Sequence, residues 1–109
     1  MLSYLREDIG NLYKKIIVIG LYNSAYFSKK ERDYIFSYVS KKNNCDQCYV
    51  DHLPFEFDID TFDNSIINLV DKLIEDSQYH DTAVDPQLLL QIKCIIAFTH
   101  FANAMNNLN

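Results

Sequence analysis

Residues 43–54 read Asn43-Asn-Cys-Asp-Gln-Cys-Tyr-Val-Asp-His-Leu-Pro54, and the two ends of this stretch place helix breaks near the middle of the chain. The paired asparagines end a preceding helix, and either of them can cap a new one because asparagine is a favoured N-cap residue. A helix cannot readily continue into a proline. We therefore expect a short helix that begins at or beside Cys45 and ends before Pro54.

Helical patterns also precede this stretch. From Leu5 to Tyr22, apolar residues recur at the spacing of an amphipathic helix. The sequence Ser28-Lys-Lys-Glu31 is a capping-box pattern, in which the serine and the glutamate satisfy each other's backbone N–H groups. This pattern predicts a second helix from Ser28 to about Lys42, whose final lysines suit the negative end of the helix dipole.

The stretch is followed by a loop and then by another helical pattern. Leu53–Asp60 is predicted to be a loop with apolar anchors, and it is a candidate cover for the cysteines. A fourth helix is expected over roughly Thr61–Asp76, because its apolar residues again recur at helical spacing. Asp58 or Asp60 is the expected cap of this helix, since aspartate side chains accept hydrogen bonds from early backbone N–H groups.

The final helical pattern begins at Asp85-Pro86, which places an N-cap aspartate before a proline at the first helical position. This helix is expected to continue to about Asn106. With only two glycines and two prolines in 109 residues, the chain lacks the turn residues that all-β domains use. We therefore predict an all-α fold, with residues 1–109 forming a single domain.

The charge and hydropathy of the chain exclude several classes of function. A net charge of −5 and an isoelectric point near 4.9 argue against nucleic acid as a partner, since phosphate backbones require a positive surface. The first residues carry no basic start followed by an apolar run, so no signal peptide is expected. No stretch is expected to reach the ~18 apolar residues of a membrane span. These features predict a cytoplasmic protein without a membrane partner.

The Cys45-x-x-Cys48 pair with His52 is the strongest indication of chemistry in the sequence. On a helix that begins near Cys45, the two thiols and the imidazole fall along one face. The free N–H groups at a helix start favour a thiolate, whereas the carboxylate of Asp46 beside Cys45 disfavours one. In a reducing compartment, such a pair is more often catalytic or metal-binding than structural.

Zinc binding is the main alternative use of these residues. Cys45, Cys48 and His52 supply three possible ligands, with His80 or His100 as a fourth. The usual zinc pattern takes its ligands in two separated pairs, and this sequence has only one pair. A thioredoxin fold is disfavoured because no βαβ pattern surrounds the motif.

The remaining cysteine and histidines have simpler interpretations. Cys94, alone on the last predicted helix, is expected to be a buried apolar residue. His80 lies in a polar linker and is expected to be solvated. His100 is expected to be a core or surface histidine with its hydrogen bonds satisfied.

The motif Cys45-x-x-Cys48-x-x-x-His52, with eleven residues between Asp33 and the first cysteine, resembles the AhpD-like family, also called the alkylhydroperoxidase D or carboxymuconolactone decarboxylase family. Residues 95–103, Ile-Ile-Ala-Phe-Thr-His-Phe-Ala-Asn, are similar to the last helix of that family, where an asparagine commonly stands near this point. The resemblance covers about residues 28–108.

This resemblance implies an all-α bundle of about five helices that assembles into a homo-oligomer, as a trimer or hexamer. It implies that the dithiol reduces a small hydroperoxide, with no cofactor and no metal. By carry-over, Cys48 is the peroxidatic thiol, Cys45 resolves its sulfenic acid as a disulfide, and His52 with Asp33 relays protons. A dithiol reductant protein of the lipoyl or thioredoxin type then restores the thiols.

The sequence departs from the family pattern at two positions. The family usually has glutamate where this chain has Asp33, and Glu31 is an alternative acid two residues away. AhpD places a histidine of its relay where Gln47 stands here. The decarboxylase members lack the cysteine pair, so their activity is less expected. Two alternatives stay open: a domain that exchanges or senses disulfides without its own peroxide substrate, and a zinc-stabilised interaction module.

Overall fold

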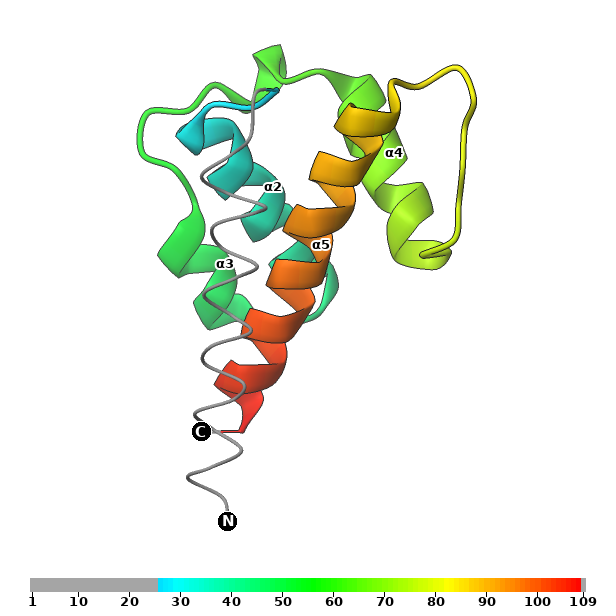
Figure 1. Ribbon diagram of the computed structural model, residues 1–109. Helices are drawn as coiled ribbons and strands as arrows, with labels where there is room; N and C mark the ends of the chain where they lie inside the picture. Colours follow the sequence, from blue (N-terminus) through cyan, green and yellow to red (C-terminus); the bar gives the residue numbers. More distant parts are fainter. Residues whose placement is uncertain (1–25, 109) are drawn as a thin grey trace.

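All regular structure that the computed structural model describes, over residues 26–108, is helical (Figure 1). This confirms the all-α prediction for the described residues. The first predicted helix, Leu5–Tyr22, lies outside them, and so does part of the predicted single domain. The described elements, in chain order, are α2 (Lys29–Lys42), α3 (Asp46–His52), the 3₁₀ turn η2 (Ile59–Thr61), α4 (Asn64–Glu75) and α5 (Pro86–Asn107).

The start of α2 and the turn between α2 and α3 agree with the sequence predictions. The Ser28 hydroxyl accepts from the Glu31 N–H at 3.2 Å, and the Ser28 N–H donates to the Glu31 carboxylate at 2.8 Å, which completes the capping box. Asn43 is the C-cap of α2. Asn44 follows with φ 59°, a left-handed conformation that asparagine tolerates well. α3 begins beside Cys45, as expected, but its N-cap is Cys45 and not one of the asparagines, and no side chain caps the helix.

The predicted cap of α4 is wrong. Asp63 caps this helix, and its carboxylate accepts from the Ser65 N–H at 2.9 Å. Asp58 instead caps η2, where it accepts from the Asp60 N–H at 3.0 Å. Aspartates follow one another closely here, and each is able to cap. The inserted 3₁₀ turn moves the helix start from the predicted Thr61 to Asn64.

The start of α5 confirms the Asp85-Pro86 prediction. The Asp85 carboxylate accepts from the Gln87 N–H at 2.9 Å, and Pro86 occupies the first turn. The Tyr26 hydroxyl donates to the other carboxylate oxygen at 2.7 Å, which lowers the pKa of Asp85. This bond connects the segment before α2 to the start of the last helix.

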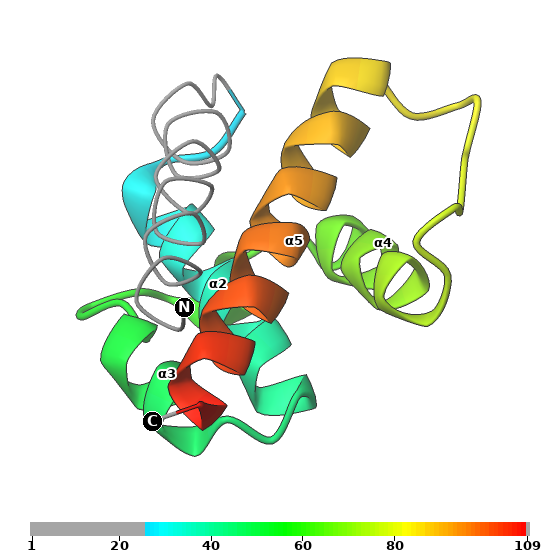
Figure 2. The ribbon, with the colours of Figure 1, turned by 60° about the horizontal axis from the view of Figure 1, so that its bottom comes forward.

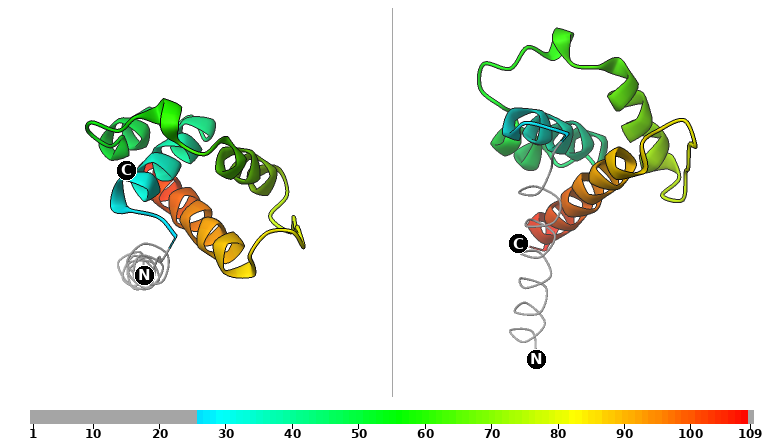
Figure 3. Two further views of the ribbon diagram at one scale, coloured as in Figure 1. Left: turned by 90° about the horizontal axis from the view of Figure 1, so that it is seen from above. Right: turned by 45° about the horizontal axis from the view of Figure 1, so that its top comes forward.

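The helices pack around α5, which lies between α4 on one side and α2 with α3 on the other (Figure 2). Among the described residues, α2 contacts α3, α4 and α5. The segment joining α4 to α5 loops out at the end of the molecule away from α3 (Figure 3). α3 thus lies against the last part of α2 and near the carboxyl end of α5.

The buried side chains form two clusters. The larger one fills the space between α2, α4 and α5, and it is centred on Phe27, Ile35, Val39, Phe62, Leu69, Val70, Leu73, Leu89, Ile92, Ile95 and Ile96. The smaller one lies between α2, α3 and α5, and it consists of Phe36, Cys45, Cys48 and Phe98 with Ala102 packed against it. The cysteines therefore belong to a separate apolar cluster at the α3 end of the molecule.

The loop after α3 anchors on the larger cluster. Phe57 stacks on Tyr34 with ring centroids 5.2 Å apart, and it also contacts Phe62. Phe55 is 82% exposed. The apolar side chains that pack on the cysteines in residues 26–108 come from α2 and α5. The expectation that the loop covers the cysteines therefore receives no support.

α5 is long and apolar enough to cross a membrane by length and composition. This finding corrects the expectation that no stretch of the chain reaches that length. However, α5 contributes buried residues to both apolar clusters, and the core helix of a soluble protein passes the same test. The length of α5 is therefore weak evidence for a membrane span.

Candidate redox site

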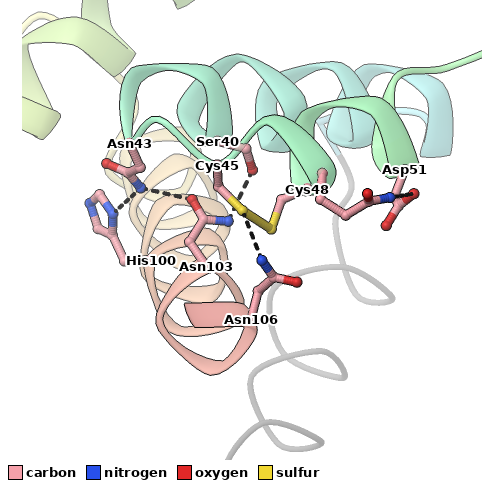
Figure 4. Close-up of a disulfide and its surroundings, with 9 residues drawn as sticks. Ser40, Asn43, Cys45, Cys48, Asp51, His100, Asn103 and Asn106 are labelled. Atoms are coloured by element: carbon pink, nitrogen blue, oxygen red, sulfur yellow. Dashed lines mark hydrogen bonds between the residues drawn. A yellow bond between two sulfur atoms is a disulfide. The ribbon is translucent and has the colours of Figure 1, made fainter. Parts of the chain in front are cut away.

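Cys45 and Cys48 form a disulfide at the start of α3 (Figure 4). Their Cα atoms are 5.4 Å apart, within the usual range for a bridge. The Cys45 N–H donates to the Ser40 carbonyl at 2.9 Å, and its own carbonyl accepts from the Tyr49 N–H at 3.0 Å. The backbone on both sides of Cys45 is therefore held in place. Cys48 lies one helical turn further along α3.

Both cysteines are buried against aromatic rings. Cys45 is 4% exposed and Cys48 is 8% exposed. Phe36 and Phe98 complete this cluster, with their ring centroids 5.3 Å apart. An apolar environment raises the cost of a thiolate unless a polar group compensates it. The polar neighbours of the two sulfurs therefore decide how they react.

His52 lies at the end of α3 with its ring against Phe36, at a centroid distance of 3.9 Å. Burial lowers the pKa of His52, while the nearby carboxylates of Asp33 and Asp51 oppose this shift. The Asp33 carboxylate itself accepts from the Lys29 ammonium at 2.9 Å. Across residues 26–108, no hydrogen bond joins His52 to Asp33 or to a sulfur. The relay role of His52 and Asp33 stays a prediction.

Glu31, the alternative acid, and Gln47, which stands where AhpD has a relay histidine, both have other partners. The Glu31 carboxylate is used in the capping box of α2, and it is not among the groups that shift the pKa of His52. The Gln47 amide donates to Asp51 at 2.8 Å. Asp33 is therefore the acid on α2 that acts electrostatically on His52 in this structure.

α5 presents a polar face beside the disulfide that the sequence motifs do not predict. His100, Asn103 and Asn106 are spaced three residues apart, so their side chains follow one side of the helix (Figure 4). The Asn106 amide donates to Cys45 Sγ at 3.5 Å. In the sequence, this polar face is indicated only by the spacing of three polar residues within an otherwise apolar helix. Of the three, the sequence singles out Asn103 through the family resemblance and His100 as a possible zinc ligand or a satisfied histidine, but not Asn106.

The other two residues of this face hold the turn between α2 and α3. The Asn103 side chain is buried, and its amide donates to the Ser40 hydroxyl at 3.1 Å. The Asn43 amide nitrogen lies 3.0 Å from the Asn103 oxygen and 2.8 Å from His100 Nδ1. These bonds connect α5 to the turn that leads into Cys45. They also satisfy His100, in agreement with its sequence interpretation.

The described residues do not form a set of zinc ligands around the two cysteines. Within the described part of the chain, no three histidine, cysteine or acidic side chains come together in a group that could hold a metal ion. His80 is exposed, as predicted, and His100 faces Asn43. The sulfurs of Cys45 and Cys48 are bonded to each other.

Cys94 on α5 is the free cysteine of the described chain. It is half-buried, whereas the sequence predicted full burial. Burial raises the pKa of its thiol, which keeps it protonated near neutral pH. Cys94 is therefore expected to be less reactive than a thiol with a polar partner.

No family model, curated protein or solved structure matches this chain. The resemblance to the AhpD-like family thus depends on the spacing of Asp33, Cys45, Cys48 and His52 and on the weaker similarity of residues 95–103.

The lowered pKa values of two histidines predict a pH dependence of stability. Burial lowers the pKa of both His52 and His100, so the unfolded chain binds more protons than the folded one near pH 6. Their contribution is fully present above the unfolded pKa of about 6.5 and is lost as the pH falls through the folded pKa. We expect the free energy of unfolding, measured with urea, to be lower at pH 5.5 than at pH 7.5. A double variant with His52→Gln and His100→Gln should show a weaker dependence, and an undiminished one would contradict this assignment.

Proposed function

We propose that this chain is a thiol-dependent hydroperoxide reductase of the AhpD-like type, in which Cys45 and Cys48 cycle between a dithiol and a disulfide. The observation that carries the proposal is the disulfide itself, formed between the two cysteines of the motif on the helix that also carries His52. A pair already within bonding distance can close without rearrangement of the backbone. This is the requirement for a resolving thiol beside a peroxidatic one.

The oxidative half of the cycle balances as two substitutions. The Cys48 thiolate attacks the terminal oxygen of the hydroperoxide, the O–O bond breaks, and the departing alkoxide takes a proton to become an alcohol. The Cys45 thiolate then attacks the Cys48 sulfenic acid and displaces hydroxide, which is protonated to water. His52, one turn after Cys48, is proposed to carry these protons, with Asp33 adjusting its pKa.

The reductive half requires a dithiol donor, proposed to be a lipoyl- or thioredoxin-type protein. One donor thiolate attacks the disulfide, and the second donor thiol closes the donor's own disulfide and restores both cysteines. A reducing cytoplasm would maintain such a donor. Assembly into an AhpD-like homo-oligomer is part of the same proposal, and the mass of the native protein in solution tests it.

Disulfide exchange or redox sensing without a peroxide substrate is the second candidate. The observation that favours it is the absence, among residues 26–108, of a hydrogen bond from His52 to either sulfur. Thiol–disulfide exchange needs no general acid when the leaving sulfur is stabilised as a thiolate. This candidate uses the same disulfide but requires a protein disulfide as its oxidant and a protein thiol as its reductant.

One assay separates these candidates. Consumption of hydrogen peroxide and of an alkyl hydroperoxide is measured with dithiothreitol, dihydrolipoamide and reduced thioredoxin as donors, with a Cys94→Ser variant as a matched control. We expect turnover in the wild type and in the control. No turnover with any donor, together with rapid reduction of the disulfide by the donors, would instead identify an exchange protein. Stoichiometric zinc in the purified protein would favour the interaction module.

A further inference from the structure

The two sulfurs of the disulfide differ in their polar contacts. The Asn106 amide donates to Cys45 Sγ at 3.5 Å, from the last turn of α5 (Figure 4). Among residues 26–108, no hydrogen-bond donor contacts Cys48 Sγ. A donor gains most from a sulfur that carries a negative charge, because hydrogen bonds to charged acceptors are roughly twice as strong as neutral ones.

We propose that Asn106 stabilises the thiolate of Cys45 whenever the disulfide is opened or closed, so that Cys45 is the leaving and resolving thiol and Cys48 is the sulfur that is attacked. This inference rests on the proposed redox function, and it adds a residue that the motif does not contain. The division of roles between the two thiols is the one that the family resemblance implies, and the Asn106 contact gives a physical reason for it.

The position of Asn106 depends on the contacts one turn earlier in α5. The buried Asn103 side chain bonds to Ser40 and Asn43, which flank the end of α2. The carbonyl of Ser40 accepts from the Cys45 N–H. The same turn therefore holds Cys45 and fastens α5 beside it. Asn106 is itself exposed, and this framework keeps its helix turn within reach of the sulfur.

The chemistry follows from this asymmetry. When a donor thiolate attacks Cys48 Sγ, a mixed disulfide forms and the electron pair of the broken S–S bond stays on Cys45 Sγ. The Asn106 N–H then donates a hydrogen bond to this thiolate. In the reverse sense, the Cys45 thiolate attacks a Cys48 sulfur that carries either a hydroxyl or a donor sulfur. Hydroxide or the donor thiolate leaves. Both half-reactions thus pass through the same Cys45 thiolate.

Other charges surround the disulfide, and they bear on any titration of Cys45. Asp46 follows Cys45 directly and disfavours a thiolate there. The ionisable groups on α3 and on the nearby described parts of α2 and α5 include Lys29, Asp33, Lys41, Lys42, Asp46, Tyr49, Asp51, His52 and His100. All of these groups are retained when Asn106 is replaced. A difference in the pKa of Cys45 between the variants therefore measures the effect of the Asn106 amide.

The test measures the pH dependence of alkylation of Cys45 by iodoacetamide in a Cys48→Ser, Cys94→Ser background. We compare Asn106, Asn106→Ala and, as a matched control, Asn107→Ala on the next residue of the same helix. The Asn106→Ala change is expected to raise the midpoint by about half a unit to one unit, a roughly three- to tenfold loss of thiolate near neutral pH. The control should leave the midpoint unchanged. Equal midpoints in all three proteins would overturn the inference.

A second measurement keeps both thiols. In fully reduced protein carrying only Cys94→Ser, peptide mapping after alkylation across a pH series should give Cys45 a lower midpoint than Cys48. The opposite order would overturn the inference. Neither measurement uses a peroxide or a donor protein. If the Cys45 midpoint is low but no peroxide is turned over, the proposed function is wrong and the role of Asn106 stands. If peroxide is turned over but Asn106→Ala leaves the Cys45 midpoint unchanged, the proposed function stands and the role of Asn106 is wrong.

Discussion

Replacing Cys48 by serine is expected to reduce hydroperoxide turnover to the uncatalysed rate. A serine hydroxyl is not a nucleophile towards the O–O bond at neutral pH, and Cys48 is the thiol assigned to that attack. Cys48 is also part of the smaller apolar cluster, so the variant loses the disulfide as well. Steady-state peroxide consumption with an excess of dithiol donor measures the effect. Full turnover in this variant would remove the assigned role of Cys48.

The Cys45→Ser variant is the matched comparison, because it loses the same disulfide but keeps the attacking thiol. It should react once with peroxide and then stop as a Cys48 sulfenic acid, which a dimedone adduct on the Cys48 peptide detects. Both variants lack the bridge equally, so a difference between them reports chemistry and not stability. Identical behaviour of the two variants would contradict the division of roles.

Changes at the proposed proton relay are expected to give the next largest effect. His52→Gln should lower turnover by about 10²-fold or more, in the range of general acid–base catalysis. Asp33→Asn should act in the same direction but less strongly, roughly tenfold, because Asp33 opposes the effect of burial on the pKa of His52 without bonding to it. The rate of peroxide consumption measures both, and urea unfolding checks that the variants are folded.

A surface aspartate gives the control for the charge change. Asp60 is exposed, and in the described contacts only its backbone N–H is used, as the donor to the Asp58 cap. Asp60→Asn should therefore keep the wild-type rate while removing one negative charge. A wild-type rate in Asp33→Asn as well would exclude Asp33 from the relay, and a wild-type rate in His52→Gln would exclude the relay altogether.

The helix boundaries near the disulfide could be predicted because local residues determine them. Ser28 with Glu31, the asparagines before Cys45, and Asp85 before Pro86 each act through hydrogen bonds or backbone restrictions within a few residues. The cap of α4 could not be predicted in the same way. Several neighbouring aspartates are equally able to cap, and tertiary packing selects among them.

The surroundings of the sulfurs depend on contacts between distant parts of the chain. Asn106 and Cys45 are 61 residues apart, and Asn103 and Ser40 are 63 apart. The spacing of the motif predicts that the thiols and His52 share a helix face, but it contains no information on which residues of α5 face them. The polar stripe of α5 becomes a candidate only once α5 is placed against the turn before α3.

The central claim is that Cys45 and Cys48 cycle reversibly between dithiol and disulfide, with peroxide as the oxidant. The most direct measurement is mass spectrometry of the fully reduced protein after one equivalent of hydroperoxide, followed by addition of a dithiol donor. The account predicts a Cys45–Cys48 disulfide that forms with the peroxide and is reopened by the donor. Peroxide that leaves both thiols reduced, or that drives Cys48 to sulfonic acid without a disulfide, would contradict it.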